Sequence, residues 1–349
     1  MERVPAGSDD ELMAVLGYDS VGSSSTTVSY DEHLMCQFTA SATSIIRQLS
    51  IYIINAVPGE FLRLTIYSDD SDSPLSYMGQ TVEITMASDG WYTALLQCPL
   101  VITSGTIYWL GVISNSEFDV AYESTASDPV VGWELAFVSY GQPDNPWTEA
   151  ADSSGSGKYS IYAYNVTLPV PWIGYKDPKY GFYSGDGPGA DYMVLIKVLA
   201  IENITIATVG AHLDSGFTGG EYARAVIYSD DGANTPTDLL GQSDPIEGVD
   251  TDMLYEFTLQ STVDFVSGEY YWIGIHTPQN TYYMSYTFPV LTVASDYRYG
   301  IIDTYADGPA DPCNAPDTFG ATQLGFYAAG TASVGEISNN SAGIILTIL

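Results

Sequence analysis

Two acidic segments carry the residue types that bind hard metal ions. Residues 69–72 read Asp-Asp-Ser-Asp, and residues 230–234 read Asp-Asp-Gly-Ala-Asn. Calcium takes about six to eight oxygen ligands, which carboxylates and carbonyls supply. The spacing does not match an EF-hand loop, and a solvated turn is the alternative. We predict one calcium ion for each segment, held by Asp69, Asp70, Asp72, Asp230 and Asp231.

Aromatic side chains in segments rich in glycine and proline form a second set of candidates. Aromatics on irregular segments are better binding candidates than aromatics within strands. They stack on sugar rings or anchor a protein interface, and packing within the loop is the alternative. We predict a glycan or partner site at Trp133, Tyr140, Trp147, Tyr282, Tyr283 and Tyr286.

Trp109 and Trp272 lie instead in strand-like apolar sequence. We predict that both fill the interior, with the indole N–H bound to a carbonyl, and a sugar-stacking platform is the alternative. Arg63 and Arg224 are two of only nine basic residues. For them we predict an ion pair with a carboxylate of the acidic segment that follows, with binding of a carboxylate ligand as the alternative.

No arrangement of residues points to catalysis. His33, His212 and His276 have no metal-ligand spacing to one another or to cysteine. The sequence holds no Gly-X-Ser-X-Gly motif and no phosphate-binding glycine loop. Carboxylates are numerous, but nothing singles out an acid–base pair. We therefore predict that the chain is not an enzyme.

Residues 343–349 form a short, uncharged and β-prone segment. Exposed segments of this kind aggregate, so we expect this one to pair with another strand. It either folds back on its own domain or is donated to a neighbouring subunit by β-augmentation. The residues predicted to support assembly are Ile344, Ile345, Leu346, Ile348 and Leu349.

Charge excludes several classes of partner. The chain of 349 residues has 9 Lys and Arg against 43 Asp and Glu, a net charge of -34. Such a surface repels nucleic acids and anionic membranes, and no apolar stretch is long enough to insert into a membrane. Residues 1–17 lack the basic start and apolar run of a signal peptide. Cys36 and Cys98 are expected as buried thiols, with a bridge between them as the alternative.

The chain contains an internal repeat. Residues 60–70, Glu-Phe-Leu-Arg-Leu-Thr-Ile-Tyr-Ser-Asp-Asp, match residues 221–231, Glu-Tyr-Ala-Arg-Ala-Val-Ile-Tyr-Ser-Asp-Asp. Residues 108–112, Tyr-Trp-Leu-Gly-Val, match residues 271–275, Tyr-Trp-Ile-Gly-Ile. The repeat divides the chain into an N-terminal tail (1–15), module 1 (16–168), module 2 (169–331) and a C-terminal tail (332–349).

Each module shows the pattern of half-buried strands. Leu49, Ile51 and Ile53 alternate with Ser50 and Tyr52, the period-two pattern of a strand with one buried face. Turn-forming clusters separate such stretches, and no amphipathic helical run is evident. The sequence predicts an all-β fold of two tandem jelly-roll-like β-sandwich domains.

The order of the motifs resembles a known architecture. In each module a strand ending in Ile-Tyr-Ser-Asp precedes an acidic loop, a Gly-Gln step and a Tyr-Trp strand. This order is similar to that of the tandem jelly-roll modules of secreted and virion surface proteins, which are similar in outline to carbohydrate-binding modules. The resemblance covers both modules and implies a fold more than a ligand.

These observations favour a non-catalytic structural or interaction protein of a surface assembly. We expect a virion capsid or tail decoration, or a subunit of a cell-surface filament, that assembles through sheet edges and tails. Its expected partners are copies of itself or other structural subunits, at the virion or extracellular surface. A lectin-like adhesion module that binds cell-surface glycans is the alternative. No cofactor other than calcium is expected.

Overall fold

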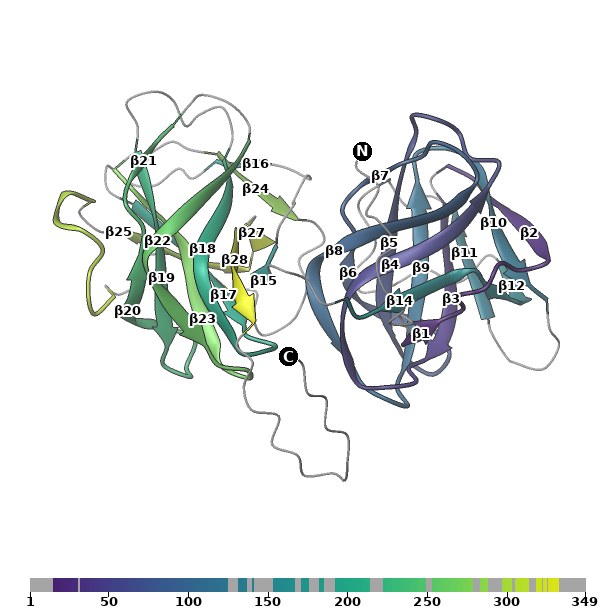
Figure 1. Ribbon diagram of the computed structural model, residues 1–349, viewed down its shortest axis with the longest axis horizontal. Helices are drawn as coiled ribbons and strands as arrows, with labels where there is room; N and C mark the ends of the chain where they lie inside the picture. The colour runs from purple at the N-terminus through teal and green to yellow at the C-terminus, as the bar shows by residue number, and fades with distance from the viewer. Residues whose placement is uncertain are drawn as a thin grey trace, which may run out of the picture.

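In a computed structural model of the chain, the described residues form β-strands joined by turns (Figure 1). The one helical element among them is the 3-10 helix η1 (Tyr305–Asp307). The predicted all-β fold is therefore confirmed. No helix in this part of the chain is long and apolar enough to cross a membrane. The described residues are 15–30, 32–124, 131–136, 140, 153–166, 171–175, 182–184, 192–213, 222–248, 253–278, 283–287, 297–302, 305–313, 318–321, 323–324 and 326–332.

Module 1 consists of two antiparallel sheets of seven strands each. The first sheet contains β1 (Leu16–Gly17), β2 (Ser24–Val28), β4 (Ser44–Ile54), β8 (Gly90–Ile102), β10 (Phe118–Glu123), β13 (Lys158–Tyr159) and β14 (Ile161–Tyr164). The second contains β3 (Glu32–Thr39), β5 (Phe61–Asp69), β6 (Pro74–Gln80), β7 (Ile84–Thr85), β9 (Ile107–Ser114), β11 (Val131–Ala136) and β12 (Ser153–Ser156). Strand β4 pairs with β8, β14 and β10, whereas β9 lies between β3 and β5.

Module 2 repeats this arrangement with two further sheets of seven strands. One contains β15 (Trp172–Gly174), β16 (Phe182–Ser184), β18 (Ile204–Leu213), β22 (Met253–Phe265), β24 (Tyr283–Thr287), β27 (Gln323–Leu324) and β28 (Phe326–Ala332). The other contains β17 (Tyr192–Leu199), β19 (Tyr222–Asp230), β20 (Pro236–Gln242), β21 (Ile246–Glu247), β23 (Tyr270–Thr277), β25 (Tyr297–Ile302) and β26 (Thr318–Ala321).

The strand pairing of module 1 recurs strand for strand in module 2. The order β1-β14-β4-β10 corresponds to β15-β28-β18-β24, and β11-β3-β9-β5-β6 corresponds to β25-β17-β23-β19-β20. Residues that occupy the same place in the two sets of sheets are called equivalent below. All strand pairs among the described residues lie within one module, and Figure 1 shows the two modules side by side. Jelly-roll winding of these strands stays a prediction.

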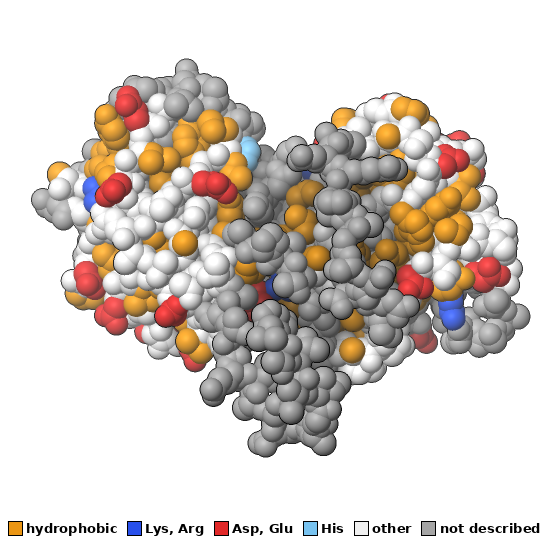
Figure 2. All heavy atoms as spheres, in the orientation of Figure 1, with side chains coloured by type: hydrophobic (Ala, Val, Ile, Leu, Met, Phe, Trp, Pro, Cys, Tyr) orange, Lys and Arg blue, Asp and Glu red, His pale blue; other side chains and the backbone are white. Residues whose placement is uncertain are grey.

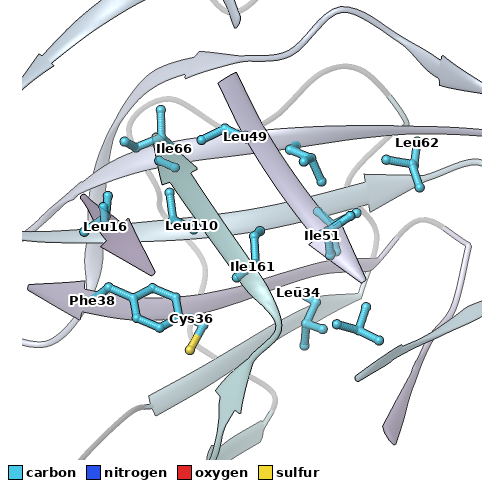
Figure 3. Close-up of a cluster of buried hydrophobic side chains, with 14 of the residues drawn as sticks. Leu16, Leu34, Cys36, Phe38, Leu49, Ile51, Leu62, Ile66, Leu110 and Ile161 are labelled. Atoms are coloured by element: carbon cyan, nitrogen blue, oxygen red, sulfur yellow. The ribbon is translucent and has the colours of Figure 1, made fainter. Parts of the chain in front are cut away.

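Each module buries a core between its two sheets. The alternation in β4 turns Leu49, Ile51 and Ile53 inward, as the sequence pattern predicts. Figure 3 shows side chains from β1, β3, β4, β5, β9 and β14 converging in module 1. Cys36 is buried among them, and burial raises the pKa of its thiol. Cys98 is only partly buried, and none of the three cysteines forms a disulfide.

The second sheet of each module is buried on both faces. In module 1, Trp109 and Tyr67 alternate with residues of the core and therefore lie on the opposite face, yet both are fully buried. In module 2 the hydroxyl of Tyr228 on that face donates to the carbonyl of Ala310 (2.8 Å), so the segment after β25 packs over it.

The buried indoles bind carboxylates. Trp109 Nε1 donates to Asp69 Oδ1 (2.8 Å), and Trp272 Nε1 donates to Asp230 Oδ1 (2.7 Å). The prediction that both tryptophans fill the interior is confirmed. The predicted carbonyl partner is wrong. The indole N–H groups are bound instead by the side-chain carboxylates of Asp69 and Asp230, the last residues of β5 and β19. Charge-assisted bonds of this kind are about twice as strong as neutral ones.

The two modules balance this carboxylate in different ways. In module 1, Gln37 Nε2 donates to Asp69 Oδ1 (3.1 Å) and to Asp72 Oδ1 (3.0 Å). Module 2 has Lys197 at the equivalent position, and its Nζ lies 2.9 Å from Asp230 Oδ2 and 2.5 Å from Asn234 Oδ1. The lysine also lies over the ring of Tyr270, 4.2 Å from its centroid.

The two arginines of the repeat bind other partners than the acidic segments. Arg63 lies 3.6 Å from a carboxylate oxygen of Glu83, beyond β6, and is almost fully buried. Arg224 donates to the carbonyl of Tyr305 (3.1 Å) and lies over its ring. The predicted ion pairs with residues 69–72 and 230–234 are wrong, because each arginine lies six residues before the end of its strand, about 20 Å away in extended backbone.

His33 is buried beside Thr65, with 2.7 Å between Nε2 and the threonine hydroxyl. Burial lowers the pKa of His33 to about 3. The unfolded chain takes up this proton below pH about 6.5 and the folded chain only near pH 3, so stability falls as the pH falls through that window. At pH 5 the loss from this group is about 2 kcal/mol.

Replacing His33 with methionine, the residue that Met193 supplies at the equivalent position of module 2, is expected to remove this pH dependence. Urea unfolding at pH 7 and pH 5 measures it: the wild type is expected to lose about 2 kcal/mol more than His33→Met. His212→Met, at a partly exposed histidine, serves as the control. Parallel losses in the wild type and His33→Met would contradict the assignment.

Among the described residues, two polar contacts join the modules. Trp172, on the first strand of module 2, donates its indole N–H to the carbonyl of Gln97 on β8 (3.4 Å). Arg47 forms an ion pair with Glu202 of module 2 and donates to Asn165 (3.0 Å). Arg47 lies at a register shift of β4, and such bulges re-aim side chains. The irregularity therefore turns an arginine out of its own sheet toward the neighbouring module.

Candidate ligand-binding face

Four aromatic side chains form a strip on the outer face of the first sheet of module 1. The aromatic strip consists of Tyr52, Trp91, Tyr162 and Tyr164. The ring centroids of Tyr52 and Trp91 are 5.4 Å apart, those of Trp91 and Tyr162 5.1 Å, and those of Tyr162 and Tyr164 5.5 Å. Figure 2 shows hydrophobic side chains gathered on this face of module 1.

The register of three strands brings the rings together. Tyr52 on β4 pairs directly with Trp91 on β8. One row further, Ser50 lies between Tyr162 on β14 and Thr93 on β8. Because serine is small, the indole of Trp91 has room beside it to reach Tyr162. The strip thus crosses three strands, and its side chains are fixed by cross-strand packing.

Three of the four side chains in the strip are accessible to a ligand. Trp91 has an exposed fraction of 37%, and Tyr52 and Tyr162 are partly exposed. Tyr164 is buried at one end, and burial raises the pKa of its hydroxyl, with a further contribution from Tyr162. Ser50 and Thr93 are hydrogen-bonded to each other below the rings (2.7 Å). The arrangement presents apolar ring surface with hydroxyl groups around it.

The strip carries no charge in a strongly acidic chain. The outward positions of β8 in this region hold Trp91, Thr93 and Leu95, and those of β14 hold Tyr162 and Tyr164. All are uncharged at neutral pH. A ligand on the strip itself therefore meets aromatic and hydroxyl groups, whereas the outward carboxylate of Asp119 on the neighbouring strand β10 is bound to Thr27 and Asn55.

Module 2 uses the equivalent face differently. Its residues at the strip positions include Leu254, Tyr327 and Ala329. Trp172 packs on Tyr327 and Ala329, and Leu95 of module 1 packs against the same cluster. The hydroxyl of Tyr327 donates a hydrogen bond to Glu256 (2.5 Å). Burial, and to a lesser extent this hydrogen bond, raises the pKa of the Tyr327 hydroxyl. In module 1 this face is exposed around Trp91, whereas in module 2 the equivalent face is covered at the module junction, where Leu95 meets it.

Gly210, equivalent to Ser50, is required by this packing. A Cβ at Gly210 would lie 2.0 Å from Cε1 of Tyr327. Gly210→Ala is therefore expected to destabilise module 2 by about 1–3 kcal/mol, because the tyrosine ring must move. Urea unfolding compares it with Gly79→Ala, where the added Cβ would meet only the flexible side chain of Leu100, at 3.3 Å. Equal destabilisation by the two changes would contradict this packing argument.

Three of the six aromatics singled out in the sequence lie in strands and not in loops. Trp133 lies on β11 in the second sheet of module 1, whereas Tyr283 and Tyr286 lie on β24 in the first sheet of module 2. The assignment to irregular segments is wrong for these three, and the two groups belong to non-equivalent sheets. Tyr140 donates its hydroxyl to Glu83 (3.1 Å). Trp147 and Tyr282 lie outside the described residues.

The predicted calcium ligands already have protein partners. Asp69 and Asp72 accept from Gln37, and the Lys197 ammonium lies against Asp230. Asp231 accepts from the backbone N–H groups of residues 233 and 235, which lowers its pKa. Among the described residues, no group of three or more His, Cys, Asp or Glu is arranged to hold a metal ion. The calcium sites stay a prediction, with Asp70 exposed beside them.

The aromatic strip was missed in the sequence although its signal was present. In residues 49–53 the inward positions are aliphatic and Tyr52 is an outward position. The same reasoning marks Trp91 as outward, because Tyr92 and Leu96 contact the core. Large aromatics at outward positions of a two-faced strand are the signal to look for.

The sequence matches no protein-family model. A search of curated proteins likewise finds no match. The fold defines an all-β protein of two similar modules, one of which has aromatic side chains on an outer sheet face.

Proposed function

We propose that the chain is a non-catalytic binding protein whose module 1 holds neutral glycans on the aromatic strip. The observation that carries the proposal is the contact of Trp91 with both Tyr52 and Tyr162 on an open sheet face. Sugar rings present apolar C–H faces, which pack on aromatic rings, and hydroxyl edges, which hydrogen-bond to tyrosine and serine hydroxyls.

Charge selects among the glycans. A net charge of -34 repels polyanions such as sulfated glycans and nucleic acids. The strip itself is uncharged, so binding of a neutral polysaccharide requires no ion pair. A rigid strip on a sheet also reduces the ordering cost of binding, because its side chains are already packed against one another.

Gel electrophoresis through immobilised polysaccharides tests the proposal. Gels that contain a neutral β-glucan, xylan, galactomannan or α-glucan are compared with a plain gel and a heparin gel. We expect at least one neutral polysaccharide to slow the protein and heparin to leave its mobility unchanged. Unchanged mobility in every neutral gel, or retardation by heparin alone, would overturn the proposal.

Surface assembly is a second proposal, and the module junction favours it. The outer sheet face of module 2 accepts β8 of module 1 through Leu95, so sheet faces of this fold serve as packing surfaces. The tail residues Ile344, Ile345, Leu346, Ile348 and Leu349 lie outside the described residues. A virion or extracellular surface remains the proposed location, where copies of the chain or other subunits are the partners.

Light scattering of the full chain against a shortened chain tests assembly. Because β28 ends at Ala332, the shortened chain should end there, so that the last strand of module 2 is kept intact. Large particles formed by the full chain alone would support assembly through the tail. Monomers in both cases, with or without calcium, would count against it.

A further inference from the structure

A cleft of about 550 Å³ lies between the two modules. Its module 1 wall is formed by β6 and β8, and its module 2 wall by residues around β15, β17 and Tyr270. Apolar side chains dominate both walls, including Met78, Leu100, Val101, Ile173, Val198 and Leu199. Binding sites for small molecules often lie at domain interfaces and have volumes of roughly 300–1,000 Å³.

The cleft offers no unbalanced charge. Its one charged wall residue is Lys197, whose ammonium is neutralised by Asp230 at 2.9 Å and also bound to Asn234 at 2.5 Å. No Asp or Glu is among the described lining residues. An anionic ligand would therefore compete with a buried carboxylate for the lysine, and a cationic ligand would find no acidic partner.

The walls are held in place by the junction contacts. Arg47 with Glu202, and Trp172 with Gln97, tie module 1 to module 2. Ile173, next to Trp172 in β15, lines the cleft, and Gln97 precedes the cleft residue Cys98. The same contacts that fix the modules therefore fix the shape of the cleft, and a preformed apolar site binds without a large ordering cost.

We propose that the inter-module cleft binds a small, neutral, largely apolar molecule. The size excludes a folded partner, the scarcity of polar groups disfavours a sugar, and the balanced charge disfavours an ion. Ser68 and Ser76 in the wall supply hydroxyls that fix the orientation of a single polar group on the ligand. This site is separate from the aromatic strip and does not depend on glycan binding.

Cys98 in the cleft wall provides the test. In a Cys313→Ser background, Cys36 is buried and Cys98 is the partly exposed thiol. The neutral dye N-phenyl-1-naphthylamine is expected to bind with saturable fluorescence at one site per chain and to slow alkylation of Cys98 by N-ethylmaleimide. Prior alkylation of Cys98 is expected to weaken dye binding at least tenfold, because the adduct fills the cleft.

The control moves the thiol to module 2. Ser261 is exposed and equivalent to Cys98, so alkylation of Cys98→Ser/Ser261→Cys/Cys313→Ser should leave dye binding unchanged. No saturable binding, or equal binding after alkylation of Cys98, would overturn the proposal. A chain ending at Ala332 that binds the dye tenfold more tightly than the full chain would also overturn it, because residues 333–349 would then be the occupant.

Discussion

Trp91→Ala is expected to weaken binding of the recognised neutral polysaccharide at least tenfold, about 1.4 kcal/mol. Trp91 contacts the rings on either side of it, so its removal breaks the continuous surface on which a sugar chain would lie. Tryptophan and tyrosine anchors at the centre of an interface carry most of the binding energy. Titration calorimetry with the polysaccharide identified in the gels measures the loss.

Tyr30→Ala is the matched control for this change. Tyr30 is an aromatic residue of module 1 with an exposed fraction of 68%, and it is not part of the strip. The affinity of Tyr30→Ala for the polysaccharide should match that of the wild type. The melting temperatures of Tyr30→Ala and Trp91→Ala should both lie within about 3 °C of the wild type. Because no ion pair is involved, affinity should also stay nearly constant between low and high salt. Equal affinity of Trp91→Ala and the wild type would contradict the assignment.

The fold followed from local patterns in the sequence. Alternation in residues 49–53 identified a two-faced strand, and β4 has those residues facing inward and outward as expected. The repeat of residues 60–70 in residues 221–231 corresponds to β5 and β19, which occupy the same place in the two modules. Such features depend only on neighbouring residues, so a sequence reveals them.

The site depended on contacts between distant residues. Trp109 binds Asp69 and Asp69 binds Gln37 because β9 lies between β3 and β5, and strand order is not encoded by alternation. The choice of Trp133 and Tyr283 assumed loops in which strands continue. The strip itself requires that β8, β4 and β14 be adjacent, which only the pairing reveals.

The two modules have diverged at equivalent positions. The strip of module 1 and the covered face of module 2 share a tyrosine, Tyr162 or Tyr327, but Leu254 replaces Trp91 and Ala329 replaces Tyr164. Smaller side chains leave room for Trp172 and Leu95 at the junction. In module 2 this face therefore packs against module 1, whereas in module 1 Trp91 stays partly exposed.

Lys197→Met is expected to destabilise module 2 by about 3 kcal/mol, because it leaves the Asp230 carboxylate buried without its cation. The side chains of Lys197 and Asp230 are 2% and 4% exposed, so water replaces little of the lost interaction. For a domain of this size the change lowers the melting temperature by roughly 6–12 °C. Differential scanning calorimetry of the whole chain measures the effect as a shift of one of its transitions.

Lys197→Gln separates the role of charge from that of hydrogen bonding. Gln37 bonds to Asp69 at the equivalent position of module 1, so a glutamine amide is expected to recover part of the loss, and adding Asn234→Asp would reproduce the polar set of module 1. Lys158→Met, at a partly exposed lysine, is the control and should change the free energy of unfolding by about 1 kcal/mol or less. If Lys197→Met has the melting temperature of the wild type, the ion pair does not stabilise module 2, and the bonds from Trp272 and from the Gly232 N–H hold Asp230 in place.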